Sequence, residues 1–234
     1  EWDVIIIGSG FAGLAAGLKA AQKGSKVLIL EKMGRIGGNS VINGGGMSVP
    51  MNPVQEKTGI KDSKELFMND CLKAGLGINH PELLSTLADR GLDAFKFLVD
   101  NGVHFGGHSV ARSMLTTNDS GSGYIQPMLE KFEALKDKGC ELRRRAKFDD
   151  FVMDEGRVAG VVIREEYKFD PNLYSDDLEN TSGTKKTLKA KKGVVLAAGG
   201  FCRDKIFRKL QDPRIPDDVD STNYAGATAG VLLK

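Results

Sequence analysis

The sequence predicts an α/β fold in which helices flank a parallel sheet and an antiparallel β-meander is inserted into the chain. Three observations lead to this prediction. A buried apolar strand at residues 3–7 runs into a glycine turn and a helix, and a second apolar strand follows at residues 27–31. Short alternating strands fill much of residues 141–190. A last buried strand at residues 193–201 ends in small residues and is expected to return beside the first.

The glycine turn after the first strand has the spacing G-x-G-x-x-G, formed by Gly8, Gly10 and Gly13. Gly8 permits the tight turn, Gly10 lets the backbone approach a pyrophosphate, and Gly13 lets the helix pack on the strand. Phosphates would lie on the N–H groups at the positive end of the helix. Glu31, at the end of the second strand, can accept ribose hydroxyls. The pattern predicts a Rossmann-like dinucleotide-binding unit, and a glycine turn that only closes a βαβ unit is the alternative.

Length and composition restrict the class of protein. The chain has 234 residues, is 41% hydrophobic and 27% charged, and has a net charge of +2. It can bury a large core, and its interspersed charges favour neither nucleic acid nor a membrane surface. No apolar stretch reaches the length of a membrane-spanning helix, and no signal-peptide pattern is present. Because the chain begins at Glu1, we expect that a leader or an N-terminal domain has been removed.

The cysteines and histidines of the chain predict neither a metal site nor a disulfide bond. The three cysteines are far apart and fit neither a disulfide framework nor a zinc site: Cys71, Cys140 and Cys202. The three histidines have no ligand spacing, since two glycines interrupt the last pair: His80, His104 and His108. No metal is predicted, so a redox role would require a bound organic cofactor.

The elements between the first helix and the meander follow from local patterns. An alanine-rich amphipathic helix is expected over residues 11–23, closed by Gly24. Residues 33–48 hold many glycines among apolar residues, which favours an ordered loop lying flat against a ligand over a flexible one. Further helices are expected at residues 63–75, 81–91, 92–101 and 124–138, with Asn79 as a cap. Residues 106–123 are polar and irregular, and either a ligand cradle or an exposed loop fits them.

The second half reads as strands that return to the sheet. The meander is expected at residues 141–145, 147–153, 157–163 and 187–190, with a polar excursion at residues 170–186. The small residues that end the 193–201 strand leave room for a cofactor near the first glycine turn.

Four motifs in this order carry a resemblance to a known family. They are the 8–31 unit, Gly37–Met47, Gly193–Phe201 and Ser221–Thr228. Together they resemble the fumarate reductase and succinate dehydrogenase flavoprotein family, and within it the flavin subunit of soluble flavocytochrome c. The likeness runs through nearly all of the chain.

The resemblance implies FAD as the cofactor, and it implies where each part of FAD binds. It places the pyrophosphate at Gly8, Gly10, Phe11, Ala12 and Gly13, and the adenosine ribose at Glu31. It places the diphosphate and ribityl chain along Lys32, Gly38, Asn39 and Ser40. The reactive edge of the flavin would lie near Gly44, Gly45, Gly46 and Met47. The adenine would lie at Phe148, with the same half of FAD flanked by Ala197, Ala198 and Gly199.

Two positions depart from the family pattern. Where membrane-bound members carry the histidine that bonds to the flavin, this chain has Asn39, so noncovalent FAD is expected. Where the family continues Thr228 as Gly-Asp-Gly, this chain reads Ala229-Gly230-Val231, which leaves the role of that aspartate open.

The resemblance also implies what the residues after Lys234 would contain. In the family, the capping domain, the proton-donating arginine, the substrate-binding residues and the last flavin-binding segment all lie downstream. We therefore expect residues 1–234 to be an incomplete FAD-binding domain, inactive alone, and we assign no catalytic residue to it.

The expected activity is hydride transfer from flavin N5 to a small α,β-unsaturated carboxylate, with fumarate as the leading candidate. A cytochrome c electron donor is implied, and the periplasm is favoured over the cytoplasm. Three alternatives remain: a pyridine-nucleotide dehydrogenase, a flavoenzyme of the same fold with another substrate, and a noncatalytic nucleotide-binding fragment. The second includes ketosteroid dehydrogenases, aspartate oxidases and urocanate reductases.

Overall fold

The computed structural model describes the backbone of residues 1–234 and the side chains of residues 1–106 and 111–234. His108 therefore lies outside the described side chains. The chain divides into two compact units. The first unit comprises residues Glu1–Ile42 and Leu129–Lys234, and the second comprises Asn43–Met128.

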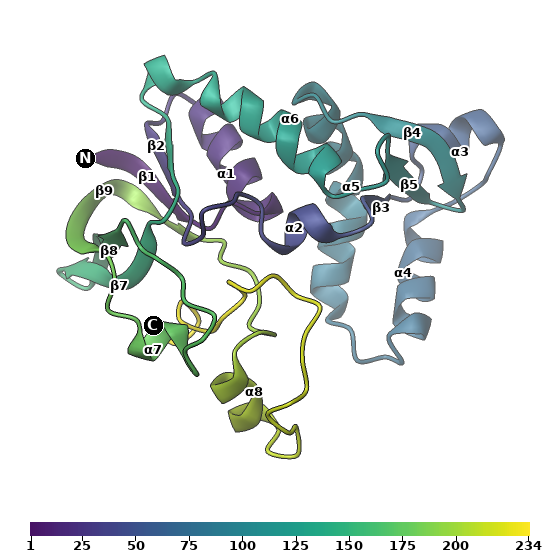
Figure 1. Ribbon diagram of the computed structural model, residues 1–234. Helices are drawn as coiled ribbons and strands as arrows, with labels where there is room; N and C mark the ends of the chain where they lie inside the picture. The colour runs from purple at the N-terminus through teal and green to yellow at the C-terminus, as the bar shows by residue number, and fades with distance from the viewer. The chain divides into compact units, whose positions relative to one another are not determined.

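The first unit is built on a six-stranded sheet with the order β6-β2-β1-β9-β8-β7 (Figure 1). Its strands are β1 (Trp2–Ile7), β2 (Val27–Leu30), β6 (Glu141–Arg143), β7 (Lys147–Asp154), β8 (Arg157–Glu165) and β9 (Thr184–Leu196). β1 pairs in parallel with β2 and β9, and β2 pairs in parallel with β6. β7, β8 and β9 pair antiparallel. This mixed sheet confirms the predicted α/β fold with an antiparallel meander.

β9 joins the two parts of the sheet. Its first part pairs antiparallel with β8, with Lys189 opposite Gly160, and its last part pairs in parallel with β1, with Leu196 opposite Ile7. The prediction of two strands, 187–190 and 193–201, was wrong, because the single strand β9 of 13 residues pairs with both β8 and β1. The chain leaves the sheet after Leu196, where Gly199 adopts a left-handed conformation with φ of 81°.

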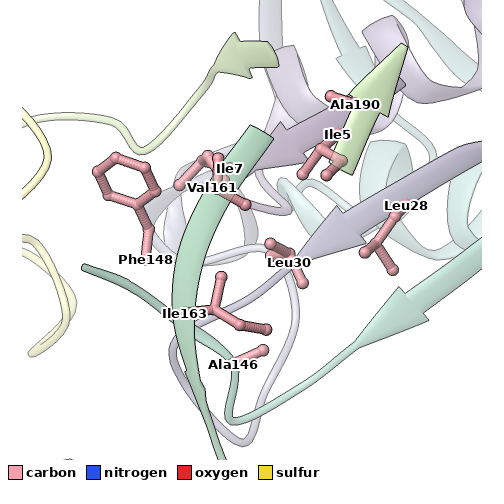
Figure 2. Packing of buried hydrophobic residues seen from close by; sticks show 9 residues of the cluster. All are labelled: Ile5, Ile7, Leu28, Leu30, Ala146, Phe148, Val161, Ile163 and Ala190. Atoms are coloured by element: carbon pink, nitrogen blue, oxygen red, sulfur yellow. The ribbon is translucent and has the colours of Figure 1, made fainter. Parts of the chain in front are cut away.

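Alternate residues of the parallel strands point to opposite faces of the sheet, and both faces are covered. On one face, Ile6 and Ile29 lie against α1 (Phe11–Gln22), where glycines allow close packing. On the other face is a core of nine buried residues, shown in Figure 2: Ile5, Ile7, Leu28, Leu30, Ala146, Phe148, Val161, Ile163 and Ala190. This double burial explains why both strands are continuous apolar runs.

Three short helices complete the first unit outside the sheet. They are α2 (Asn39–Ile42), α7 (Asp176–Glu179) and α8 (Lys205–Gln211), and a 3₁₀ turn at Lys136–Lys138 precedes β6. α7 lies inside the predicted polar excursion, which ends at β9.

The second unit contains a three-stranded sheet of order β3-β5-β4 and four helices. The strands are β3 (Gly46–Ser48), β4 (Phe105–Val110) and β5 (Ser113–Thr116). The helices are α3 (Pro53–Thr58), α4 (Lys64–Ala74), α5 (Pro81–Asp100) and α6 (Ser122–Glu133), and α6 continues into the first unit after Met128.

Three predictions for the second unit were wrong. The helices expected at 81–91 and 92–101 form the single helix α5, which continues unbroken through Gly91. The missing side chain of Gly91 leaves room for the Val49 side chain. His80, not Asn79, is the N-cap of that helix. The irregular loop expected at 106–123 contains β4 and β5, because backbone pairing with β3 supplies order that its local composition does not indicate.

Candidate functional site

A cavity of about 640 Å³ lies in the first unit where β1 and β9 end. Its walls come from the glycine turn, the end of β2, residues 37–40, the loop after β9, and residues 224–234. The carboxyl ends of parallel strands are the usual ligand site of such sheets. Motifs far apart in the sequence therefore meet around one cavity.

The three glycines of the turn serve different purposes. Gly8 has φ of 103°, and a Cβ there would lie 2.3 Å from the carbonyl oxygen of Ala197. A Cβ at Gly13 would lie 1.9 Å from the carbonyl oxygen of Gly8. Gly10 has an ordinary φ of −73°, and the nearest atoms to a Cβ there would be the Ser40 hydroxyl at 3.0 Å and the Gly37 carbonyl at 3.7 Å. Gly8 and Gly13 are therefore needed by the fold, whereas Gly10 keeps space open in the cavity.

The glycine turn is fastened to the end of β2 by Glu31 and Ser9. Glu31 is only 8% exposed, and its carboxylate accepts hydrogen bonds from the Ser9 N–H at 3.2 Å and from the Ser9 hydroxyl. Its other oxygen accepts from the Met33 N–H at 2.9 Å, and the Gly37 N–H donates to the Ser9 hydroxyl at 3.0 Å. Burial raises the pKa of Glu31, and these hydrogen bonds oppose that rise.

Ser9 is a site residue that the sequence reasoning missed. The only signal was a polar residue between the first two glycines of an otherwise apolar turn. Its hydroxyl lies between Glu31 and Gly37, so it orders both the Glu31 carboxylate and the start of the 37–40 loop.

Asn39 links the second motif to the fourth. Its amide nitrogen donates to the Asn223 side-chain oxygen at 2.7 Å, and its own side-chain oxygen accepts from the Tyr224 N–H at 2.6 Å. Next to it, Ser40 accepts from the Phe11 N–H at 3.1 Å, at the start of α1. The 37–40 loop is thus bonded both to the glycine turn and to the 221–228 segment.

A smaller cavity of about 70 Å³ adjoins the first and shares Gly8, Glu31 and Ala198 with it. Phe148 and Lys32 line the smaller cavity. The Lys32 amine donates to the Thr228 hydroxyl at 2.6 Å, so its side chain turns toward Phe148 and away from the larger cavity. Burial lowers the pKa of Lys32, and nearby carboxylates oppose this.

Ala197, Ala198 and Gly199 follow β9 and line the larger cavity, as do Phe11, Ala12 and Gly38. The Ala197 N–H donates to the Ile7 carbonyl at 2.8 Å, which holds this loop beside the glycine turn. The expectation that small residues here leave room for a ligand agrees with this arrangement.

Gly44, Gly45, Gly46 and Met47 belong to the second unit, so their part in cofactor binding stays a prediction. Within that unit, Gly45 has φ of 69°, and a Cβ there would lie 2.4 Å from the Thr116 hydroxyl. Its carbonyl accepts from the Tyr124 hydroxyl at 3.0 Å. Packing within the unit is therefore sufficient reason for this glycine.

Among residues with described side chains, no cluster of histidine, cysteine or acidic groups could hold a metal ion. The three cysteines are free. Within the described part of the chain, no helix has the length and apolar character needed to cross a membrane.

The residues of the larger cavity fit a dinucleotide. The first N–H groups of an α-helix have no acceptor inside that helix. In α1 the Phe11 N–H donates to Ser40, and Gly10 leaves the start of the helix approachable. The Glu31 carboxylate lies where a ribose is expected, and the cavity volume suits a cofactor.

Comparisons with known proteins agree with this geometry. Residues 3–228 match the family described as FAD binding domain. The chain is 43% identical over 237 residues to the acrylate reductase flavoprotein subunit of Shewanella woodyi, covering 97% of this chain and 45% of that protein. It is 35% identical over 236 residues to urocanate reductase of Eggerthella lenta, and this match covers 97% of this chain and 36% of that protein.

Among solved structures, the open conformation of a flavocytochrome c3 fumarate reductase superposes with a TM-score of 0.81 at 27% identity. That likeness covers 99% of this chain and 39% of the other. The chain thus spans less than half the length of each of these three proteins. It belongs to the FAD-binding domain family of the fumarate reductase and succinate dehydrogenase flavoproteins, which are FAD-dependent oxidoreductases.

Proposed function

We propose that this chain holds the FAD of an enzyme that reduces the double bond of a small α,β-unsaturated carboxylate. The observation that carries the proposal is the 43% identity to an acrylate reductase subunit over 97% of the chain. Similarity to a urocanate reductase and to a fumarate reductase supports the same substrate class. Bound FAD would supply the hydride, and a nearby acid would protonate the adjacent carbon.

The proposed FAD position follows the two cavities. Gly10 and the first turn of α1 hold the pyrophosphate, Glu31 accepts a ribose hydroxyl, and the adenine lies near Phe148. Because Glu31 is already fixed by Ser9 and Met33, it is oriented before FAD arrives and little ordering is needed on binding. We propose that Lys32 acts at the adenosine end, since its amine bonds to Thr228 there.

Substrate-binding and proton-donating residues are proposed to lie outside residues 1–234. This proposal rests on the resemblance and on the share of each relative that the chain covers. A cytochrome electron donor and a periplasmic location are proposed by analogy with the flavocytochrome c3. Residues 1–234 are then proposed to bind FAD and to orient its flavin.

The substrate class can be tested with the full-length protein loaded with FAD. We expect it to oxidise reduced viologen dye when acrylate, fumarate or urocanate is added, at roughly 1 s⁻¹ or faster with its true substrate. Methyl acrylate, which keeps the activated double bond without the carboxylate, should give little turnover. Dye that stays reduced with all three acids would contradict the proposal. Turnover of a 3-ketosteroid would favour the alternative substrate class.

We expect FAD to be bound without a covalent bond. Asn39 offers no nucleophilic ring nitrogen, and its amide is already bonded to Asn223 and Tyr224. Acid precipitation should therefore release FAD into the supernatant and leave a colourless pellet. Flavin fluorescence that stays with the polypeptide on a denaturing gel would show this expectation to be wrong.

A further inference from the structure

Asp177 is a buried carboxylate that belongs to none of the motifs recognised in the sequence. It lies on α7, inside the polar excursion, and its side chain is 9% exposed. Its neighbour Asp176 has partners close in the chain, since it accepts from the Tyr167 hydroxyl just before the excursion and from the Asn180 amide within it. Asp177 instead reaches out of the excursion and lines the smaller cavity.

The contacts of Asp177 join three separate parts of the first unit. One oxygen accepts from the Gly230 N–H at 2.9 Å. The other lies 3.6 Å from the Lys32 amine and 3.8 Å from the Lys147 amine. Figure 1 draws α7 beside the C-terminal end of the chain, in agreement with the bond to Gly230. The Asp177 carboxylate thus lies between the partly buried Lys32 and the buried Lys147 at the wall of the cavity, and Lys147 also pairs with Asp149 at 3.2 Å.

The charge state of Asp177 fits this position. Burial by itself raises the pKa of its carboxyl, but Lys32, the Thr228 hydroxyl, Lys147 and the Gly230 N–H together hold that pKa below its ordinary value. The group is therefore an anion at neutral pH.

Asp177 occupies the space that a side chain at Gly230 would take. A Cβ at Gly230 would lie 2.6 Å from the Asp177 carboxyl carbon and 2.6 Å from one of its oxygens. The backbone of Gly230 is not left-handed, so apart from Asp177 the position could carry a side chain. In the family pattern this is the position of the aspartate in Gly-Asp-Gly. A carboxylate from α7 therefore lies where a carboxylate from residue 230 would begin.

We propose that Asp177 replaces the aspartate that this chain lacks at residue 230, and that it is a positioning residue for the adenosine end of FAD. It acts through Lys32 and the 228–230 backbone, which it holds against the cavity beside Glu31 and Phe148. The inference rests on the proposed FAD site. It assigns to the inserted excursion a role in cofactor binding that neither its sequence nor the motifs predict.

A set of four proteins tests this replacement: wild type, Asp177→Ala, Gly230→Asp, and the double variant. FAD affinity is measured by titrating apoprotein and following flavin fluorescence, and folding by circular dichroism of the apoproteins. Asp177→Ala should weaken FAD binding by at least about tenfold, because Lys32 loses its ion-pair partner and Lys147 keeps only Asp149. Gly230→Asp alone should also weaken it, since two carboxylates would compete for one space.

The double variant should recover affinity to within about threefold of wild type, because a single carboxylate is again present. Wild-type affinity in Asp177→Ala would overturn the proposal, as would a double variant no better than Asp177→Ala. If Asp177→Ala does not fold, the double variant decides: a folded, FAD-binding double variant supports the replacement, and one that fails to fold or bind overturns it.

Two further variants separate this proposal from the FAD site on which it rests. Asp150→Asn removes a carboxylate that is 59% exposed on β7, and FAD affinity should not change. Gly10→Val should lose FAD whatever the role of Asp177. If Gly10→Val keeps FAD, the proposed site is wrong; if only the four-protein set fails, the role of Asp177 is wrong.

Discussion

Gly10→Val is expected to fold and to lose FAD. The φ of −73° and ψ of −167° at Gly10 are extended values that a β-branched residue adopts readily, so the backbone need not change. The nearest atoms to its Cβ would be those of Ser40 and the Gly37 carbonyl, and the Ser40 hydroxyl at 3.0 Å would have to shift slightly. The valine side chain would then fill the space in front of α1 where the pyrophosphate is proposed to bind. We expect FAD affinity to fall by roughly 100-fold or more, because several charge-assisted hydrogen bonds to the pyrophosphate would be lost.

The measurement is the ratio of flavin to protein absorbance after gel filtration, with thermal unfolding of the apoprotein as the test of folding. Gly200→Val is the matched control, because nothing lies within 4 Å of a Cβ there and the residue is exposed. Gly13→Ala should behave differently from both and lose stability, since its Cβ would lie 1.9 Å from the Gly8 carbonyl oxygen. A Gly10→Val protein that keeps stoichiometric yellow cofactor would refute the phosphate site.

Arg112→Met is expected to destabilise the second unit by about 3–5 kcal/mol, the usual cost of leaving a buried charge without its partner. Arg112 lies in the turn between β4 and β5, and its guanidinium donates two hydrogen bonds of 2.8 Å to Asp62, whose side chain is only 2% exposed. A third, also 2.8 Å, goes to Asp70. The guanidinium also lies 5.3 Å from the centre of the Phe67 ring.

Chemical denaturation of wild type and variant would measure this loss. Arg90→Met is the control, since Arg90 and Asp93 form an ion pair whose side chains are 75% and 66% exposed. Such surface pairs contribute little, so the control should change stability by less than about 1 kcal/mol. An equal effect of the two variants would contradict the structural role of Arg112.

The pH dependence of the Arg112→Met effect provides an independent check. In the wild type, burial raises the pKa of Asp62, but Arg112, Gln55 and the Ser63 N–H outweigh it and hold the pKa below its ordinary value. The stabilisation is therefore present above the unfolded pKa of about 3.9 and is lost as pH falls through the folded pKa. In the variant, Asp62 keeps Gln55 and the Ser63 N–H but loses the guanidinium, so its pKa is expected to rise and the cost of its buried charge to disappear as pH falls. The difference between the two proteins should narrow from pH 7 toward pH 4.

The parts of the fold that the sequence predicted well depend on residues close together in the chain. β1, α1 and β2 follow from an apolar strand, a glycine turn and a second strand, all within residues 2–30. Within this turn, Gly13 is required by a near neighbour, the Gly8 carbonyl, whereas the steric requirement at Gly8 comes from the distant Ala197. FAD as the cofactor followed from four motifs in order, and the match to the FAD-binding family over residues 3–228 confirms it.

The elements that the sequence misjudged depend on distant pairing. The division of β9 into two strands was wrong because β8 and β1 order opposite parts of one strand, which no local pattern records. The β4–β5 hairpin was missed because its glycines and polar residues have low intrinsic preference for strands, and pairing with β3 supplies the missing order.

By itself the sequence determined the glycine turn and the acidic residue that follows β2, because each is a local pattern. It determined the type of cofactor because four such motifs occur in a fixed order. Only the tertiary structure decided which side chains meet around the cavity. Asn39 bonds to Asn223, and Asp177 bonds to Gly230 and lies beside Lys32. These partners are far apart in the chain, and spacing along a sequence carries no information about such contacts. They form because the sheet returns β9 beside β1 and brings the segments that follow it back to the glycine turn.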